Sequence, residues 1–171
     1  MGLRVHIAVA PNTPIGPIWV ACSQRGLVAI EIGGLLDQFT SRLKKMGFDP
    51  SGPDLQNCLD AIQQIGGYLD GRRRTFNLAI DWSVTTNFQK QVFDILLKVP
   101  FGQVITYGEI ARRLGNPKAA RAVGRAGATN PMPIVIPCHR VIGADGKLHG
   151  YRAPNGMETK AWLLALERRP S

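Results

Sequence analysis

A cysteine followed directly by a histidine is the pair of residues in this chain most suited to covalent chemistry. Cys138 and His139 come after a short β-branched run, Ile134–Ile136, which Pro137 stops. Only the thiolate of a cysteine is a good nucleophile, and a free thiol with a pKa of about 8.5 is mostly protonated at neutral pH. A base that accepts the thiol proton, directly or through a water, makes the sulfur reactive. The pattern fits a nucleophilic Cys138 delivered by a short reactive strand. A Cys-His dipeptide also occurs by chance, and a structural role for His139 is the alternative.

The other two cysteines are better explained as core residues. Cys22 lies in an apolar run typical of a strand, and Cys58 lies in one typical of a helix. Three cysteines without a CxxC pair or a tight Cys/His cluster argue against a disulfide framework and against a structural zinc site. This cysteine content favours a reducing, intracellular compartment and predicts no metal site.

Short helices are predicted to position the reactive pair, because strand patterns give way to helical spacing at Thr86. Apolar residues form one stripe over residues 87–98, in a helix that ends before Pro100. Thr106 is predicted to cap the next helix, residues 107–114, with Glu109 completing a capping box. The break Gly115-Asn116-Pro117 follows, and a further helix is predicted over residues 118–128. Helix, turn and helix together predict a helix-turn-helix.

The helix over residues 118–128 has an unusual composition of small and basic residues. Small residues let a backbone approach another surface closely, and basic residues favour a phosphate-rich partner. Close packing inside the protein explains the small residues equally well, and the basic residues favour DNA. The small residues are Ala119, Ala120, Ala122, Gly124, Ala126 and Gly127, and the basic ones are Lys118, Arg121 and Arg125.

The positive charge of the chain is concentrated in its second half. The net charge is +9. Residues 1–84 hold eight Lys/Arg and seven Asp/Glu, which leaves +1, whereas residues 85–171 hold thirteen and five, which leaves +8. Such an asymmetry is expected of a half that meets a polyanion, although a merely basic surface would also account for it.

The first half is predicted to be a small α/β unit without obvious chemistry. Strand-forming runs separated by turn residues come first, and helical segments and a last strand-like run follow. The predicted strands are 5–10, 15–22, 27–32 and 76–80, and the predicted helices are 35–46 and 55–69.

Length and the nature of the termini restrict the class of protein further. At 171 residues and 44% hydrophobic content, the chain suffices for one large domain or two small ones. Neither end resembles a targeting segment, and no stretch approaches the roughly 18–20 apolar residues of a membrane span. We therefore expect a soluble protein without a membrane partner.

The segment around the reactive pair resembles the active-site signature of the O6-alkylguanine-DNA alkyltransferases, or methylated-DNA–protein-cysteine methyltransferases. The signature here is Ile136-Pro137-Cys138-His139-Arg140-Val141. The resemblance covers about residues 86–167, and the first half fits more loosely in size and pattern. The other matching segments are 100–104, 106–107, 119–124, 130–133 and 160–164, together with Glu167.

The resemblance implies a role for each matching residue of the reactive centre. Cys138 is the expected alkyl acceptor, His139 the base acting through a bound water, and Glu167 the residue that orients the histidine. This arrangement is a cysteine counterpart of the nucleophile–base–acid relay. Asn130 is expected to fix the turn that positions the reactive strand. Tyr107 is expected to press on a phosphate and to donate a hydrogen bond to the target guanine.

The resemblance also implies how DNA is bound. The helix-turn-helix is expected in the minor groove of double-stranded DNA, with the target nucleotide rotated out of the duplex. Arg121 is expected to fill the space left in the stack, and Val141 to offer backbone contacts to the base. Further DNA contacts are expected from Thr106, Lys118, Ala119, Ala120 and Arg125, and further pocket contacts from Met132, Pro133, Tyr151 and Arg152.

The implied fold is a ribonuclease-H-like α/β domain, residues 1–84, followed by a helical domain with a winged helix-turn-helix, residues 85–171. The implied activity is DNA repair by direct reversal, in which the alkyl group of O6-alkylguanine moves irreversibly to Cys138, with O4-alkylthymine as a second candidate lesion. The resulting thioether is not hydrolysed, so each molecule acts once. No cofactor is implied, and the expected form is a monomer in the cytoplasm near the nucleoid, or in the nucleus of a eukaryote.

Two departures from the family pattern concern the pocket. Residues 152–159 form a longer loop than the short glycine-rich one usual between Tyr151 and Lys160. His149 stands where a glycine is common, and is expected to narrow the pocket. Both departures bear on the range of alkyl groups accepted and leave the relay intact.

Three other functions compete with alkyl transfer. An alkyltransferase-like binding protein flips the lesion, but such proteins lack the reactive cysteine. A winged-helix transcription regulator explains the basic half and leaves Cys138 and His139 without a purpose, and the cysteine-rich module of methylation-responsive regulators is missing. A cysteine hydrolase would turn over and does not need the arginine-bearing helix.

Overall fold

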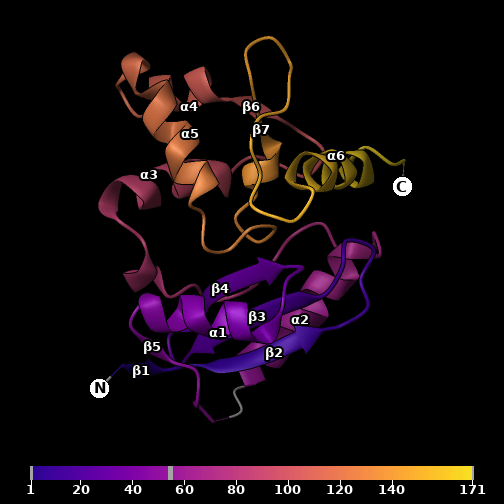
Figure 1. Ribbon diagram of the computed structural model, residues 1–171. Coiled ribbons are helices and arrows are strands. Elements are labelled where there is room, and N and C mark those ends of the chain that lie inside the picture. The colour runs from indigo at the N-terminus through magenta and orange to yellow at the C-terminus, as the bar shows by residue number, and fades with distance from the viewer. Residues whose placement is uncertain (1, 54–55, 171) are drawn as a thin grey trace. The chain divides into compact units, whose positions relative to one another are not determined.

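The computed structural model describes residues 2–53 and 56–170 (Figure 1). The chain divides into two compact units, and the boundary between them lies between Val84 and Thr85. Leu55, the first residue of the second predicted helix, lies outside the described residues.

A three-stranded antiparallel sheet forms the centre of the N-terminal unit. Its strands are β2 (His6–Ala10), β3 (Ile18–Ser23) and β4 (Gly26–Ile32), in the order β2-β3-β4. These residues fit a sheet because β-branched side chains pack well on a pleated surface. A separate parallel pair joins β1 (Leu3–Arg4) to β5 (Phe48–Asp49). The three predicted strands of the sheet are confirmed to within a few residues.

Two helices complete the core of this unit. From α1 (Leu36–Lys45), Phe39 and Leu43 pack in one buried cluster with Ala21 and other residues of the sheet. From α2 (Gln56–Leu69), the thiol of Cys58 lies 3.5 Å from the carbonyl oxygen of Val20. Burying these apolar faces is the main stabilising contribution to such a unit.

Cys22 and Cys58 are core residues, as predicted. Both are buried, at 1% and 0% exposure. The contact between the two thiols is the main cause that raises the pKa of Cys22 and lowers that of Cys58.

The strand predicted over residues 76–80 is wrong. Ile80 forms a single bridge with Leu27 at the edge of the sheet. Nearer the start of this segment, the Gln64 side chain makes the hydrogen bonds that a neighbouring strand would make. Its Nε2 donates to the carbonyl of Asn77 at 3.1 Å, and its Oε1 accepts from the amide of Asn77 at 2.8 Å. A side-chain amide can satisfy backbone groups in this way, so the extended segment needs no ladder.

Helices dominate the C-terminal unit, as predicted. A parallel two-residue pair joins β6 (Ile105–Thr106) to β7 (Val141–Ile142), and neither strand was predicted. The elements are α3 (Asn87–Leu96), β6 (Ile105–Thr106), α4 (Tyr107–Arg113), α5 (Ala120–Ala128), β7 (Val141–Ile142) and α6 (Gly156–Glu167).

Helix α3 begins with a capping box that the sequence analysis did not identify. The Thr86 hydroxyl accepts from the amide of Gln89 at 3.1 Å, and the Gln89 side chain accepts from the amide of Thr86 at 2.9 Å. This reciprocal arrangement satisfies two backbone donors that the helix leaves open. The predicted apolar stripe is confirmed, with Val92, Phe93 and Leu96 buried.

The cap of α4 is confirmed in part. Thr106 accepts from the amide of Glu109 at 3.1 Å, as an N-cap residue should. The Glu109 carboxylate forms ion pairs with Arg112 at 2.7 Å and Arg113 at 3.1 Å. The predicted capping box is therefore half formed, because two arginines one turn further on take up the carboxylate.

The turn of the helix-turn-helix differs slightly from the prediction. Gly115 has a φ of 75°, a left-handed conformation that glycine adopts at low cost. The segment Pro117–Ala119 is a 3-10 turn, with the Asn116 side chain accepting from the amide of Lys118 at 3.3 Å, and α5 proper begins at Ala120. The helix predicted from Lys118 thus starts two residues later.

The reactive segment is a turn, and the strand predicted over Ile134–Ile136 is wrong. Ile134 has a φ of 75°, and a single bridge joins Pro133 to Ile136. Cys138–Arg140 then form one 3-10 turn. Prolines have no amide hydrogen to donate to a ladder, and three of them stand at positions 131, 133 and 137, which excludes a regular strand.

The loop after Tyr151 is shorter than predicted. Asn155 has a left-handed φ of 53°, and α6 begins at Gly156, so residues 156–159 of the predicted loop are helical. A side chain at Gly156 would collide with the carbonyl oxygen of Tyr151. Among the described residues, no helix combines the length and apolar character needed to cross a lipid bilayer.

Candidate functional site

Cys138 lies on the wall of a narrow cleft in the C-terminal unit. The thiol residue is 7% exposed. Helices α3 and α5 supply much of the wall, Tyr107 contributes from the start of α4, and Val141 contributes from β7. The lining residues are Val92, Leu96, Tyr107, Val123, Gly124, Gly127, Ala128, Cys138, Val141 and Gly150.

The small residues of α5 make room for this cleft. A Cβ atom at Gly124 would lie 3.7 Å from the ring of Tyr107, and one at Gly127 would lie 3.9 Å from the Cβ atom of Cys138. A Cβ atom at either position would make an ordinary van der Waals contact, so the wall is closely packed there but the packing does not itself require glycine. The basic residues Arg121 and Arg125 are exposed.

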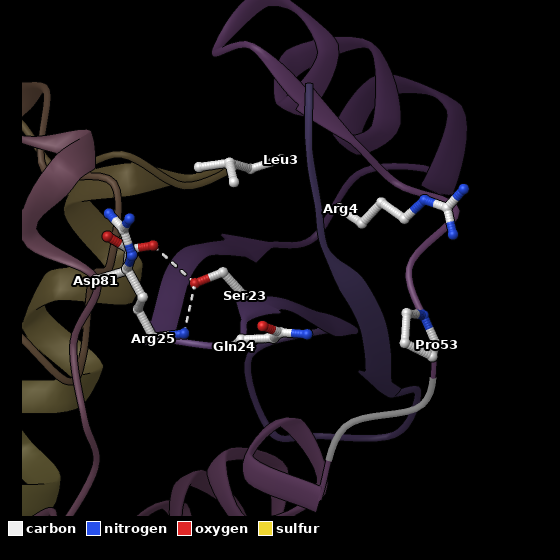
Figure 2. A pocket seen from close by; sticks show the side chains of 7 residues that line it. All are labelled: Leu3, Arg4, Ser23, Gln24, Arg25, Pro53 and Asp81. Atoms are coloured by element: carbon white, nitrogen blue, oxygen red, sulfur yellow. Dashed lines mark hydrogen bonds between the residues drawn. The ribbon is translucent and has the colours of Figure 1, made fainter. Parts of the chain in front are cut away.

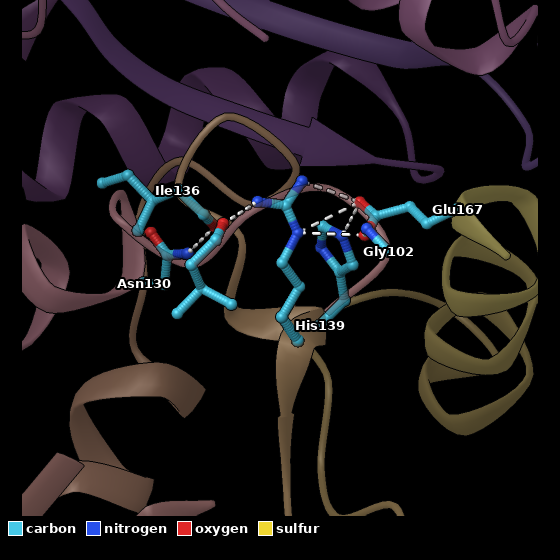
Figure 3. Close-up of polar contacts among 7 residues, drawn as sticks. Gly102, Asn130, Ile136, His139 and Glu167 are labelled. Carbon is cyan, nitrogen blue, oxygen red and sulfur yellow. Dashed lines mark hydrogen bonds and ion pairs between the residues drawn. The ribbon is translucent and has the colours of Figure 1, made fainter. Parts of the chain in front are cut away.

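His139 and Glu167 form a buried hydrogen-bonded pair. Nε2 of His139 lies 2.7 Å from Oε1 of Glu167, and Figure 3 shows the two side chains pointing toward one another. The residues are 0% and 4% exposed. The amide of Gly102 donates to Oε2 of Glu167 at 3.0 Å, which fixes the carboxylate from a second side. The pair brings together a residue of the reactive turn and one at the end of α6.

Arg140 is part of this network, and the sequence analysis assigned it no role. Its Nε lies 3.0 Å from Oε2 of Glu167, its Nη2 lies 2.9 Å from Oε1, and its Nη1 donates to the carbonyl of Val99 at 2.6 Å. A buried arginine needs an anionic partner, because an unpaired charge in the interior is costly. The available signal was an arginine directly after Cys138-His139, in a segment that is mostly apolar.

The network influences the protonation of His139 and Glu167. Burial alone would raise the pKa of Glu167, but hydrogen bonds from His139 and Arg140 bring it well below its ordinary value. Burial lowers the pKa of His139, and the hydrogen bond with Glu167 opposes that effect. A neutral imidazole that donates from Nε2 to an ionised carboxylate carries its lone pair on Nδ1. His139 can therefore accept a proton at Nδ1.

Asn130 connects three points of the reactive turn. Its Nδ2 donates to the carbonyl of Ile136 at 3.0 Å and to the sulfur of Cys138 at 3.2 Å. Its Oδ1 accepts from the amide of Met132 at 2.9 Å. Burial raises the pKa of the Cys138 thiol, and the hydrogen bond from Asn130 and the charge of Lys160 oppose that rise. The contact with the sulfur was not anticipated from the sequence.

One of the residues predicted to form the pocket lines the cleft, and the other four do not. Val141 lines the cleft, whereas Met132, Pro133, Tyr151 and Arg152 are not among the described residues on its wall. Met132 and Pro133 are buried in the reactive turn. The ring of Tyr151 lies 6.4 Å from that of His139, edge to face.

The residues predicted to contact DNA lie on or beside the helix-turn-helix. Lys118, Arg121 and Arg125 are exposed, and Ala119 and Ala120 are half-buried. Thr106 caps α4. Tyr107 is half-buried, and burial together with the charge of Cys138 raises its pKa.

A second cavity lies in the N-terminal unit. Ser23 donates to Asp81 at 2.7 Å, and Figure 2 shows these side chains pointing toward one another. In the part of the chain that the structure describes, the lining of this cavity contains no thiol or imidazole, so it offers no counterpart to the Cys138 centre. The lining residues are Leu3, Arg4, Ser23, Gln24, Arg25, Pro53 and Asp81. The described part of the chain contains no group of three His, Cys, Asp or Glu residues that could hold a metal ion.

Both halves of the chain match models of known protein domains. Residues 6–82 match the ribonuclease-like domain of 6-O-methylguanine DNA methyltransferase, and residues 87–169 match its DNA-binding domain. A methylated-DNA–protein-cysteine methyltransferase of Methanosarcina mazei is 49% identical over 156 residues, which cover 91% of this chain and 93% of that protein.

Solved structures agree with these matches. The O6-methylguanine methyltransferase of Mycobacterium tuberculosis superposes with a TM-score of 0.77 at 35% identity, covering 98% of this chain and 96% of that one. The M. tuberculosis protein OGT in complex with DNA gives a TM-score of 0.76 at 35% identity, covering 96% of this chain and 92% of that one. The agreement spans the sheet as well as the reactive turn, and the chain belongs to the 6-O-methylguanine DNA methyltransferase family.

Proposed function

We propose that this chain repairs alkylated DNA by moving the alkyl group from O6 of guanine onto Cys138. The observation that carries the proposal is the thiol on the wall of a cleft, one residue before a buried histidine that a glutamate holds. The relatives named methylated-DNA–protein-cysteine methyltransferases support the same reaction.

Each proton and bond of the proposed transfer can be assigned to a residue of the site. His139 accepts the thiol proton at Nδ1 through a water, and Glu167 stabilises the imidazolium that forms. The sulfur attacks the alkyl carbon, a C–S bond forms, and the bond from that carbon to O6 breaks. The leaving guanine takes up a proton, for which the hydroxyl of Tyr107 in the cleft is the proposed source, and the proton held by His139 then restores that hydroxyl through solvent. The thioether is stable, so each protein molecule reacts once.

Burial of the thiol suits a single-use acceptor. Burial raises the pKa of Cys138, so the resting residue is a protonated thiol that reacts poorly with stray electrophiles. Asn130 supports the sulfur and the turn together. The nucleophile is then generated mainly when a substrate occupies the cleft.

Double-stranded DNA is the proposed partner, bound through the minor groove by a monomer. The cations Lys118, Arg121 and Arg125 are exposed on and beside α5. The complex of M. tuberculosis OGT with DNA supports this partner. O6 of a stacked guanine is out of reach of a thiol in a narrow cleft, so the target base must leave the duplex, with Arg121 filling its place. A reducing compartment that holds DNA, the cytoplasm of a prokaryote or the nucleus of a eukaryote, is the proposed location.

Intact-protein mass spectrometry tests the proposal. Incubation with excess duplex DNA carrying O6-methylguanine should add one methylene to the wild-type chain and to a Cys22→Ala control, and none to Cys138→Ala. Lesion binding without a mass change would assign the chain to the binding-only class. Repaired DNA beyond one equivalent, with no mass change, would exclude the single-use mechanism.

A further inference from the structure

Lys160 is a lysine enclosed in the protein interior, on the first half of α6. It is 1% exposed and is among the largest fully buried side chains of the described residues. Lysine is almost never fully buried without a partner, because removing an ammonium group from water is costly. The function proposed above leaves this charge without a task.

Two contacts place the ammonium group beside the cleft. Its Nζ donates to the carbonyl oxygen of His149 at 2.8 Å. The same Nζ lies 6.0 Å from the ring centroid of Tyr107, which lines the cleft together with Cys138. The ring of His149 stands edge-on to Tyr107, with 6.1 Å between the centroids. Lys160 therefore links a loop carbonyl to the aromatic wall of the cleft.

The charge of Lys160 also acts on the reactive thiol. Burial lowers the pKa of Lys160, and the negative charge of a Cys138 thiolate opposes that effect. In the other direction, burial raises the pKa of Cys138, and the Lys160 charge is among the influences that lower it. Opposite charges that favour each other's ionised forms stabilise an ion pair.

We propose that Lys160 is a positioning residue of the reactive centre: its buried ammonium favours the thiolate of Cys138 and fixes the backbone at His149 beside the cleft. This inference rests on the proposed function for its biological meaning. Its physical content, the effect of one buried cation on one thiol, holds independently of DNA.

The other charged and titratable groups around Cys138 are accounted for. On the reactive turn stand His139 and Arg140, and the latter is paired with Glu167 of α6. From α4 comes the hydroxyl of Tyr107, whose pKa is raised by burial and by Cys138. Lys160 lowers the pKa of His139 as well, so its cation disfavours the imidazolium while it favours the thiolate. Removing the cation should therefore change the two pKa values in the same direction, upward.

The test is the pH dependence of thiol modification in the full chain. Methyl methanethiosulfonate, a small thiolate-specific reagent, transfers its SCH₃ group to sulfur and releases methanesulfinate. Lys160→Gln keeps a donor for the His149 carbonyl and removes the charge, whereas Lys160→Met removes both. Lys147→Gln, which removes an exposed charge from the same unit, is the matched control. Modification of Cys138 is followed by peptide mapping, thermal unfolding checks the fold of each variant, and the single-turnover transfer rate from O6-methylguanine DNA is measured alongside.

Both Lys160 variants should shift the midpoint of the Cys138 profile upward by about one pH unit, a roughly tenfold slower modification below the midpoint. Lys147→Gln should match the wild type. An unchanged midpoint in a folded Lys160→Gln protein overturns the inference, even if alkyl transfer to Cys138 is observed. If the wild type transfers no alkyl group and the midpoint still moves, the proposed function fails and the effect of Lys160 on the thiol stands.

Discussion

Nε2 of His139 and Oε1 of Glu167 lie 2.7 Å apart, and neither side chain is exposed to solvent. The same carboxylate binds Arg140. A base, an anion and a cation therefore share one buried site, in which each depends on the others. The carboxylate has two tasks, since it orients the histidine and neutralises the arginine.

Glu167→Gln should impair both stability and transfer. The substitution leaves Arg140 buried with a neutral partner, and breaking a buried ion pair costs about 3–5 kcal/mol. The single-turnover rate should fall roughly 100-fold, since the histidine loses the anion that stabilises its protonated form. Urea unfolding and quench-flow transfer measure the two effects. Glu158→Gln, at an exposed position of the same helix, should leave both unchanged; equal loss in the two variants would contradict the assignment.

Stability should fall as the pH is lowered from neutral. The pKa of His139 is below its ordinary value in the folded chain, so the unfolded chain binds more protons, and stability is lost as the pH falls below about 6.5. The pKa of Glu167 is also lowered, so its contribution is present above about pH 4.3 and is lost as the pH falls toward the folded pKa. Urea titrations from pH 8 to pH 4 check the slope, and His139→Gln should flatten its upper part. A stability that rises on acidification would contradict both assignments.

Gly124→Ala should stabilise the chain and narrow its cleft. Alanine is favoured over glycine inside a helix by about 0.8–1 kcal/mol, and its Cβ atom would make an ordinary contact at 3.7 Å with Tyr107. Transfer of benzyl groups should slow relative to transfer of methyl groups. Gly156→Ala is the opposing control, since its Cβ atom would collide with the carbonyl of Tyr151 and should destabilise the chain. Unchanged selectivity in Gly124→Ala would show that α5 does not limit the cleft.

Arg121→Ala should weaken DNA binding and leave the fold intact. The side chain is exposed, and such substitutions change stability by about 0.5 kcal/mol or less. If Arg121 contacts a phosphate in addition to filling the stack, the slope of log affinity against log salt should drop by about 1. Fluorescence anisotropy at several salt concentrations measures this slope. Lys45→Ala, an exposed cation on α1, is the control, and an equal loss there would indicate nonspecific charge effects.

The sequence predicted the elements with strong local signals and missed those fixed by distant contacts. The strands of the sheet follow from strand-forming runs bounded by turn residues, and the cap at Thr106 follows from side-chain chemistry; both are present in the structure. Residues 76–80 and 134–136 have strand-like composition, but the Gln64 amide and three prolines decide their conformation. The composition of a segment does not indicate which distant side chain will bond to it.

The residues proposed to react could be recognised from the sequence, whereas the residues that contact and support them could not. A cysteine beside a histidine can be recognised from a motif, whereas the tasks of Arg140 and Lys160 depend on Glu167 and the carbonyl of His149, which are distant in sequence. The wall of the cleft likewise comes from α3 and α5, whose contributions no single segment reveals.

The distribution of thiols has a consequence for the cell. Cys138 is the single cysteine of residues 85–171, and Cys22 and Cys58 are buried in the other unit. Under the proposed reaction, an alkyl group on Cys138 has no second thiol in its own unit to which it could pass, and a thioether does not undergo thiol exchange. The repair capacity of a cell then depends on the number of molecules of this protein and on the rate at which new ones are made. When the lesions outnumber those molecules, the excess stays unrepaired until translation replaces the spent protein.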